Sequence, residues 1–266
     1  MIANPAATPV VELRAAEKVF DDGTRGLVPI DLAVQPGEFV SLIGPSGCGK
    51  STLLRLLANL HAPSDGQVLW WRGGFDQVGG DGRRLSFVFQ EPTLMPWASV
   101  LANVRLPLDL AGVPRQEAQA RARAALQAVG LAQAQDRTPG QLSGGMRMRV
   151  SIARGMVTRP DLLLMDEPFG ALDEFTRNRL DADLAALSRQ GGLTTIFVTH
   201  SLYEAVFLSS RIVVMASNPG RLFGEMRIDP AIVRDQAFRL SERFALLCRD
   251  LSVLLTSAAL ASGEGA

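Results

Sequence analysis

A glycine-rich stretch constrains this chain more than any other feature of its sequence. It follows the apolar run 39–43, which is typical of a buried strand, and it precedes leucines at helical spacing in 53–57. Between a strand and a helix, a G-x-x-x-x-G-K-[ST] match forms a loop whose backbone N–H groups surround a phosphate. We therefore predict a phosphate-binding loop made of Gly44, Pro45, Ser46, Gly47, Cys48, Gly49, Lys50, Ser51 and Thr52.

The chemistry of phosphate binding explains the residue types in this loop. The glycines let successive N–H groups turn toward an anion, and the helix that begins near Lys50 adds the positive end of its dipole. Lys50 can place a positive charge at the β- and γ-phosphates of a nucleotide, and the Ser51 hydroxyl can bind the Mg²⁺ that bridges them. Cys48 lies among the same N–H groups near Lys50, so we expect a thiolate that reacts with alkylating agents.

Composition limits the classes of partner. Lys plus Arg and Asp plus Glu both number 27, so no global charge draws the chain to nucleic acid or to an anionic membrane. The two cysteines, Cys48 and Cys248, are far apart, which favours a reducing compartment without a disulfide. No run of 18 or more uncharged apolar residues occurs, and residues 1–9 lack the features of a signal peptide. We expect any membrane association to go through another protein.

Apolar periodicity and turn residues predict the secondary structure. The expected strands lie at about 10–20, 26–34, 38–43, 67–72, 85–90, 162–165 and 194–199. The expected helices lie at about 49–60, 99–110 with an interruption at Pro107, 115–129, 147–157 and 174–189. This pattern indicates an α/β core with a helical lobe inserted at about 92–157. In the C-terminal stretch, one or two amphipathic helices that pack back on the core are predicted from Phe238, Leu240, Phe244, Leu247, Leu251 and Leu254.

Three further stretches can contact a nucleotide, although each alone also has a structural explanation. Gln90 ends an expected strand, where its amide either reaches a phosphate-bound metal or has no special role. The serine and two glycines at 143–145 precede a helix. They either form an ordinary N-cap or bind an anion through free N–H groups. Phe20 ends the first strand, and its ring either packs in the core or stacks on an adenine ring.

Two carboxylates follow the buried strand 162–165. Asp166 can hold the Mg²⁺ shell, and Glu167 can orient and deprotonate a water molecule. Farther along the chain, Asp173 precedes a helix, and the strand 194–199 delivers His200. These residue types, together with the phosphate-binding loop, favour the hydrolysis of a nucleotide.

The motifs occur in the order found in the nucleotide-binding subunits of ATP-binding cassette (ABC) transporters, which residues 10–225 closely resemble. The matches are GPSGCGKST, Gln90, LSGGM, LLLMDEP, ALD and His200. The resemblance implies a P-loop (RecA-like) α/β core with an antiparallel β subdomain and an inserted helical subdomain. It also implies an ABC ATPase domain at 10–230, followed by a C-terminal helical extension and tail at 231–266.

The resemblance gives the motif residues their roles in hydrolysis. Glu167 would be the catalytic base, and His200 would be the switch histidine that contacts the γ-phosphate of ATP. Gln90 would be the Q-loop glutamine, which reaches the metal. Ser51 and Asp166 would hold the Mg²⁺ ion. ATP and Mg²⁺ are the implied cofactors.

The resemblance also implies a dimeric nucleotide site. The signature residues Ser143, Gly144 and Gly145 would contact ATP bound to the opposite subunit of a homodimer, and Asp173 would be the D-loop aspartate. Phe20 would stack on adenine. The signature carries methionine at 146 where glutamine is commonest in the family, but no phosphate ligand or catalytic base is lost, so we expect an active ATPase.

A finer resemblance points to the nitrate, sulfonate and taurine importers. It rests on residues 95–97, 104–108 and 145–149. It implies an ATPase that energises the uptake of a small solute at the cytoplasmic face of the inner membrane, bound to transmembrane permease subunits. An extracytoplasmic solute-binding protein would be an indirect partner, and no nucleic acid is expected. The sequence does not identify the solute.

Two alternatives stay open at the level of the sequence. The apolar loop 94–97 either docks on the permease or turns Trp97 inward onto the helical lobe. The chain could also be a soluble ABC-type ATPase that acts on DNA or ribosomes. Members of that kind carry long inserted coiled coils or two cassettes in one chain, and this sequence has neither.

Overall fold

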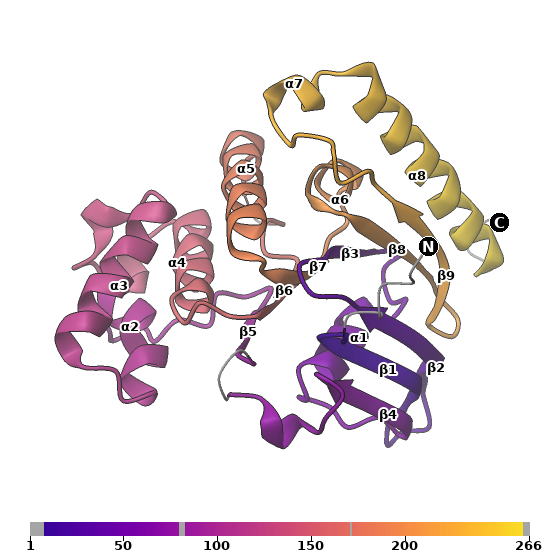
Figure 1. The fold of residues 1–266 in the computed structure, drawn as a ribbon, viewed down its shortest axis with the longest axis horizontal. Coiled ribbons are helices and arrows are strands. Elements are labelled where there is room, and N and C mark those ends of the chain that lie inside the picture. Colours follow the sequence, from indigo (N-terminus) through magenta and orange to yellow (C-terminus); the bar gives the residue numbers. More distant parts are fainter. Residues whose placement is uncertain (1–7, 80–82, 171, 263–266) are drawn as a thin grey trace, which may run out of the picture.

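A computed structural model of the chain describes residues 8–79, 83–170 and 172–262, which form two sheets and a separate group of helices (Figure 1). The strands are β1 (Val11–Val19), β2 (Arg25–Val34), β3 (Phe39–Ile43), β4 (Asp65–Trp70), β5 (Leu85–Val88), β6 (Leu162–Asp166), β7 (Thr194–Val198), β8 (Arg211–Ala216) and β9 (Arg221–Arg227). The helices are α1 (Lys50–Leu57), α2 (Val100–Leu110), α3 (Arg115–Ala128), α4 (Gly144–Met156), α5 (Glu174–Gly191), α6 (Leu202–Leu208), α7 (Gln236–Arg239) and α8 (Glu242–Ala261).

The larger sheet has six strands in the order β5-β6-β7-β3-β8-β9. Neighbouring strands are parallel, except for β8 and β9, which are antiparallel. Every residue of β3, β6, β7 and β8 is buried, as expected for strands covered on both faces. Because β3, β5, β6 and β7 run in the same direction, the residues that follow them meet at one edge of the sheet.

The smaller sheet is antiparallel, in the order β2-β1-β4. One face of it packs with α1 and the larger sheet in a common hydrophobic cluster. At the end of β4, the buried Trp70 donates its indole N–H to the carbonyl oxygen of Leu57 in α1 at 2.8 Å. This bond attaches the sheet to the helix that follows the glycine-rich loop. The two sheets confirm the predicted α/β core with an antiparallel β subdomain.

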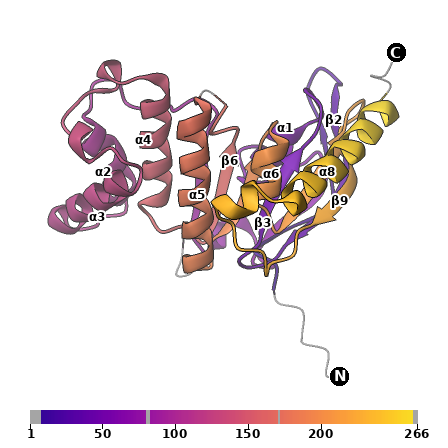
Figure 2. The same ribbon diagram turned by 90° about the horizontal axis from the view of Figure 1, so that it is seen from above.

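Helices α2, α3 and α4 form a lobe on one side of the α/β core, and α4 packs against the larger sheet through Met148 and Ile152 (Figures 1 and 2). The lobe has its own hydrophobic cluster, formed by Val100, Leu101, Val104, Leu108, Ala118, Ala122, Leu126, Leu131, Ala134, Leu142, Val150, Ala153 and Val157. The expected interruption at Pro107 was wrong, since α2 continues through it to Leu110. Pro107 lies in the last turn of the helix, where the missing N–H removes one hydrogen bond without ending the helix.

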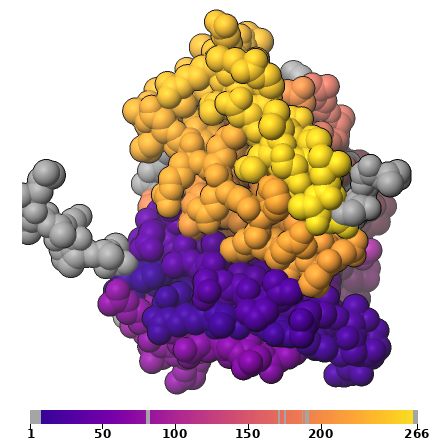
Figure 3. All heavy atoms as spheres, turned by 90° about the vertical axis from the view of Figure 1, so that its right-hand side faces the viewer, coloured from indigo at the N-terminus to yellow at the C-terminus, as the bar shows by residue number. Residues whose placement is uncertain are grey.

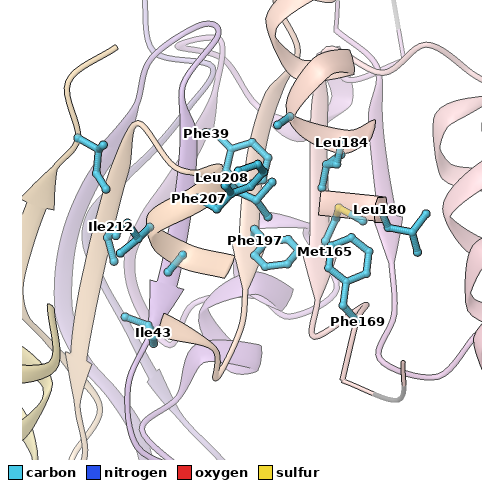
Figure 4. Close-up of a cluster of buried hydrophobic side chains, with 14 of the residues drawn as sticks. Phe39, Ile43, Met165, Phe169, Leu180, Leu184, Phe197, Phe207, Leu208 and Ile212 are labelled. Carbon is cyan, nitrogen blue, oxygen red and sulfur yellow. The ribbon is translucent and has the colours of Figure 1, made fainter. Parts of the chain in front are cut away.

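A second hydrophobic cluster joins the larger sheet to the helices on one of its faces (Figure 4). The ring of Phe197 in β7 lies 5.9 Å from that of Phe39 in β3 and 5.5 Å from that of Phe169, which follows β6. Burial of one such side chain stabilises the fold by about 1.5–3 kcal/mol. The cluster therefore fixes the ends of these strands, and it also includes Ile43, Met165, Leu180, Leu184, Phe207, Leu208 and Ile212.

The C-terminal helix α8 packs on α6, β8 and β9, and Figure 3 shows it in yellow on the surface of the molecule. The predicted packing on the core is confirmed for Phe238, Phe244 and Leu251, which are buried. It was wrong for Leu240, which lies between α7 and α8 and is 79% exposed. By length and composition alone, α8 could cross a membrane, with a mean hydropathy of 1.6, but it contains Arg249 and Asp250, and one of its faces packs on the core.

Candidate nucleotide-binding site

The glycine-rich loop connects β3 to α1 in a shape that requires glycine at two positions. A Cβ atom on Gly44 would lie 2.5 Å from the carbonyl oxygen of Met215. Gly49 has a φ of 92°, and a Cβ atom there would lie 2.6 Å from a methyl group of Leu27. The loop therefore approaches its neighbours more closely than any side chain allows.

Lys50 begins α1 and is buried at the centre of the loop. Its Nζ donates hydrogen bonds to the carbonyl oxygens of Gly44 and Pro45, each at 2.8 Å. The ammonium group is thus held against the loop backbone at the start of the helix, where the helix dipole also favours an anion. These groups fit the phosphates of a nucleotide.

The expectation that Cys48 favours its thiolate was wrong. Its side chain is fully buried, with Sγ 3.7 Å from the Lys50 Nζ. Burial raises the pKa of this thiol above its ordinary value, and the nearby ammonium only partly offsets that effect. Cys48 therefore contributes packing and a backbone N–H to the loop rather than a reactive sulfur.

Ser51 and Asp166 bring two hard oxygen ligands together beside the loop. The Ser51 hydroxyl donates to Asp166 Oδ1 at 3.0 Å, across the gap between α1 and the end of β6. Burial raises the pKa of Asp166, and the hydrogen bond from Ser51 opposes that shift. Hydroxyl and carboxylate oxygens are ligands that Mg²⁺ prefers, so this pair fits the predicted cation.

Glu167 lies at the centre of a polar group that follows the strands β5, β6 and β7. Its Oε1 lies 2.6 Å from His200 Nε2, and its Oε2 lies 3.5 Å from Gln90 Nε2. The backbone of Glu167 has a φ of 47°, a strained conformation of the kind found at functional sites. A hydrogen bond from its N–H to the carbonyl oxygen of Val198 holds this conformation.

One cavity of about 320 Å³ joins the loop to this polar group. Its wall contains Gln90, Glu167 and His200 on one side and the glycine-rich loop on the other. The sequence therefore identified residues that lie far apart along the chain and meet at a single site. The loop residues in the wall are Ser46, Gly47, Gly49, Lys50, Ser51 and Thr52.

The chain matches the family model described as ABC transporter over residues 27–170. The aliphatic sulfonates import ATP-binding protein SsuB 2 of Burkholderia lata is 42% identical over 234 residues, which cover 88% of this chain and 83% of that protein. The chain belongs to the ABC transporter family.

Two further proteins are similar to this ABC protein, one in sequence and one in structure. The bicarbonate transport ATP-binding protein CmpC of Synechococcus elongatus is 49% identical over 197 residues, which cover 73% of this chain but only 29% of that longer protein. A solved dimeric ATP-binding cassette, in a post-hydrolysis state bound to ADP and Pi, is 32% identical. It has a TM-score of 0.74 and covers 82% of this chain and 99% of that chain. The protein is thus an ATP-hydrolysing ABC subunit.

The predicted signature residues lie on the helical lobe, outside the residues described above as the cavity wall. Ser143 caps α4, its hydroxyl accepting a hydrogen bond from the Met146 N–H at 3.3 Å. Ser143 and Gly144 are exposed, whereas Gly145 lies against Leu172, the residue before Asp173. Met146 packs partly into the cluster of the helical lobe, which explains an apolar residue at that position of the signature.

Two other predicted residues lie at the margins of the site. Asp173 caps α5 by accepting a hydrogen bond from the Thr176 N–H at 2.9 Å. Phe20 packs so tightly on Gly26 that a Cβ atom there would lie 2.6 Å from its ring. The carbonyl oxygen of Gly26 is in turn 3.1 Å from the Cβ position of Gly49. Phe20 is therefore one residue away from the glycine-rich loop.

Sequence reasoning missed four charged residues that lie behind His200, two of them buried and two partly buried. Arg177, Asp181, Glu204 and Arg239 come from three different helices and pair with one another. The available signal was weak, because each of them occurs in a stretch that reads as an ordinary amphipathic helix. Only Glu204, next to the apolar run 205–208, stood out as a charge within a buried sequence.

Proposed function

We propose that this protein energises the import of a small anionic solute, of the sulfonate, nitrate or bicarbonate kind, through a membrane permease. The observation that carries the proposal is the cavity whose wall contains Lys50, Ser51, Glu167 and His200, with Asp166 hydrogen-bonded to Ser51 beside it. The importer role is supported by relatives whose names refer to sulfonate import and bicarbonate transport. No observation favours a soluble ATPase that acts on DNA or ribosomes.

The residues of the cavity divide the work of hydrolysis. Lys50 and the loop N–H groups bind the β- and γ-phosphates, while Ser51, Asp166 and Gln90 hold Mg²⁺. The bound cation neutralises negative charge on the phosphates. Glu167 orients a water molecule and takes its proton, and His200 contacts the γ-phosphate on the same side. Phe20 stacks on the adenine ring, next to the loop.

The active form is proposed to be a pair of identical chains with two ATP molecules between them. The N-terminus of α4, with Ser143 and Gly144, is exposed and offers N–H groups and the helix dipole to a phosphate. This phosphate would belong to ATP held by the glycine-rich loop of the other chain. Asp173 lies beside the same surface through Leu172 and Gly145. The dimeric relative with ADP and Pi supports this arrangement.

The permease is proposed to bind the loop 94–97 on the helical lobe, at the cytoplasmic face of the inner membrane. Trp97 is 79% exposed, so the alternative in which it turns inward was wrong. The loop backbone is fixed, because the buried Asn103 exchanges hydrogen bonds with the N–H and carbonyl groups of Met95 at 2.8 and 3.2 Å. An extracytoplasmic solute-binding protein would deliver the solute to the permease.

The test of the catalytic assignment is phosphate release by the Glu167→Gln variant of the purified chain. Glutamine keeps the shape of the side chain but cannot accept the proton, so turnover should fall by about 10²–10⁴ while ATP still binds. The Glu117→Gln variant, which neutralises an exposed carboxylate on α3, is the control and should keep its turnover. Equal turnover in both variants would exclude Glu167 as the base.

A further inference from the structure

A buried charge cluster lies behind the candidate catalytic residues. It consists of Arg177 and Asp181 on α5, Glu204 on α6 and Arg239 on α7. Arg239 Nη2 lies 2.6 Å from Asp181 Oδ2, and Arg177 Nε lies 3.3 Å from Glu204 Oε1. The side chains of Asp181, Glu204 and Arg239 are only 1%, 6% and 13% exposed. Arg177 is 29% exposed, so it lies at the margin of the cluster. Removal of one member of a pair leaves the other without its partner.

Glu204 connects the charge cluster to the segment that carries His200. The Thr199 hydroxyl donates to Glu204 Oε2 and accepts a hydrogen bond from the Ser201 N–H at 2.9 Å. These two bonds hold the residues on either side of His200. Because the imidazole itself is half exposed, its position depends on this backbone and on its contact with Glu167.

Arg177 connects the same cluster to the segment before Asp173. Its Nη2 donates to the carbonyl oxygen of Leu172 at 2.9 Å. Two members of the charge cluster, Arg177 and Glu204, also share a cavity of about 390 Å³ with Glu167 and His200. The wall of that cavity contains Glu167, Gly170, Arg177, Thr199, His200, Ser201 and Glu204.

Arg239 is the member of the cluster that comes from the C-terminal extension, the segment from residue 231 onward. Its Nη1 lies 2.6 Å from Asn178 Oδ1, and its guanidinium carbon lies 3.8 Å from the ring centre of Phe207. A planar guanidinium is thus held between α5 and α6 by two acceptors and an aromatic face. Figure 1 shows α7 lying above these two helices.

We propose that Arg239 is a positioning residue for ATP hydrolysis, through which the C-terminal extension sets the alignment of His200 and of the segment before Asp173. The inference rests on the proposed catalytic roles of Glu167 and His200. Without Arg239, the buried Asp181 carboxylate would attract Arg177, the remaining guanidinium of the cluster, because opposite charges attract strongly in a poorly solvated interior.

Movement of Arg177 toward Asp181 would take it away from both Glu204 and the Leu172 carbonyl. The two segments held by the cluster would then lose their fixed positions. Lys50 would keep its place, because the carbonyl groups of Gly44 and Pro45 hold it on the other side of the cavity. The expected result is slower turnover with an unchanged affinity for ATP.

The experiment compares Arg239→Met with Arg243→Met in the full chain. Arg243 belongs to the same extension, but its partner is the exposed Asp229 at 3.0 Å. For Arg239→Met, kcat should fall about tenfold while the KM for ATP changes by less than about twofold. Arg243→Met should match the wild type in both constants. Arg239→Lys, which restores the charge, should recover part of the lost kcat. Equal kcat in Arg239→Met and Arg243→Met would overturn the inference.

A double-mutant cycle with Thr199→Val tests the path to His200. This change removes the hydroxyl that links Glu204 to Ser201 while it keeps the volume of the side chain. If the cluster acts through Thr199, the double variant Arg239→Met/Thr199→Val should be no slower than the slower single variant. Losses of kcat that multiply would overturn the proposed path. If Arg239→Met fails to fold, Arg239→Lys enters the same cycle.

A His200→Ala variant separates this inference from the proposed function. Normal turnover in His200→Ala would contradict the catalytic site on which the inference rests. Impaired turnover in His200→Ala, together with normal turnover in Arg239→Met, would contradict only the positioning role of Arg239.

Discussion

Cys48 shows how burial outweighs a neighbouring charge at the scale of one residue. Burial raises the pKa of its thiol in spite of Lys50, and burial raises the pKa of Cys248 to about 11. Since only the thiolate reacts, we expect neither cysteine to be alkylated by iodoacetamide in the folded protein near neutral pH, and both to be alkylated in urea. Mass spectrometry of the intact chain counts the labels. Rapid labelling of Cys48 without denaturant would contradict the buried thiol.

The pKa of Glu204 predicts how the stability of the fold depends on pH. Burial raises its pKa from an ordinary value of 4.5 to about 7, so the folded state holds a proton that the unfolded state has lost. A raised folded-state pKa gives stability that is complete below the unfolded pKa and is lost as the pH rises through the folded pKa. The wild type should therefore lose stability relative to Glu204→Gln between about pH 4 and about pH 8, by up to about 3 kcal/mol.

Urea denaturation of both chains across this pH range measures that difference. The other groups titrate in both proteins, and Asp181, whose charge acts on Glu204, is the neighbour whose titration changes with it. Glutamine can still accept the hydrogen bond from Thr199, which keeps the rest of the site comparable. A constant difference in the free energy of unfolding at every pH would mean that Glu204 titrates normally in the folded chain.

Single residues also show what the sequence predicted. Lys50, Ser51, Asp166 and Glu167 stand in short motifs that suit phosphate and metal binding, and the structure brings these residues together. Arg239 could not be found in this way, because its partner Asp181 is 58 residues earlier in the chain and only the packing of α7 brings them together.

At the scale of elements, the loop 94–97 presents Trp97 on a backbone that is already fixed by Asn103. If this surface binds the permease, Trp97→Ala should leave folding and the basal ATPase of the isolated subunit nearly unchanged but weaken assembly by about 1–3 kcal/mol. Leu240→Ala, at an equally exposed position of the C-terminal extension, is the matched control. Thermal unfolding and co-purification with the permease are the two measurements.

The two outcomes of that experiment are distinct. Reduced co-purification of Trp97→Ala, with normal thermal stability and a normal Leu240→Ala control, would support the docking surface. A large loss of thermal stability with undiminished co-purification would instead mean that Trp97 stabilises the helical lobe from its exposed position, and it would remove the loop from the interface.

Elements with regular periodicity were predictable, and so were the buried strands whose apolar runs are bounded by turn residues. Strand β3 and helix α1, on either side of the glycine-rich loop, followed from an apolar run and from leucines at helical spacing. By contrast, α6, β8 and β9 were missed, because α6 and β8 are short and almost fully buried, so they show no polar face to reveal a period. The prediction that Pro107 interrupts its helix was wrong for another reason, since a proline near the end of a helix costs only one hydrogen bond.

At the scale of the whole molecule, the residues predicted to bind the nucleotide lie in two places that do not face the same cavity. The glycine-rich loop lies on the α/β core, whereas Ser143 and Gly144 lie exposed on the helical lobe. A second copy related by a twofold axis could bring the signature of each chain to the loop of the other. Hydrolysis would then separate the pair, because the γ-phosphate that both chains contact is lost.

This arrangement predicts an ATP-dependent dimer that persists when hydrolysis is blocked. Glu167→Gln keeps the loop and should bind MgATP without cleaving it, so gel filtration with saturating MgATP should shift this variant from monomer to dimer. Adding Ser143→Arg places a bulky cation at the exposed signature, which should prevent pairing while the buried Lys50 still binds nucleotide. A Glu167→Gln chain that stays monomeric at high concentration would contradict the paired mechanism. A dimer that survives Ser143→Arg would mean that the chains pair through another surface, with Ser143 outside it.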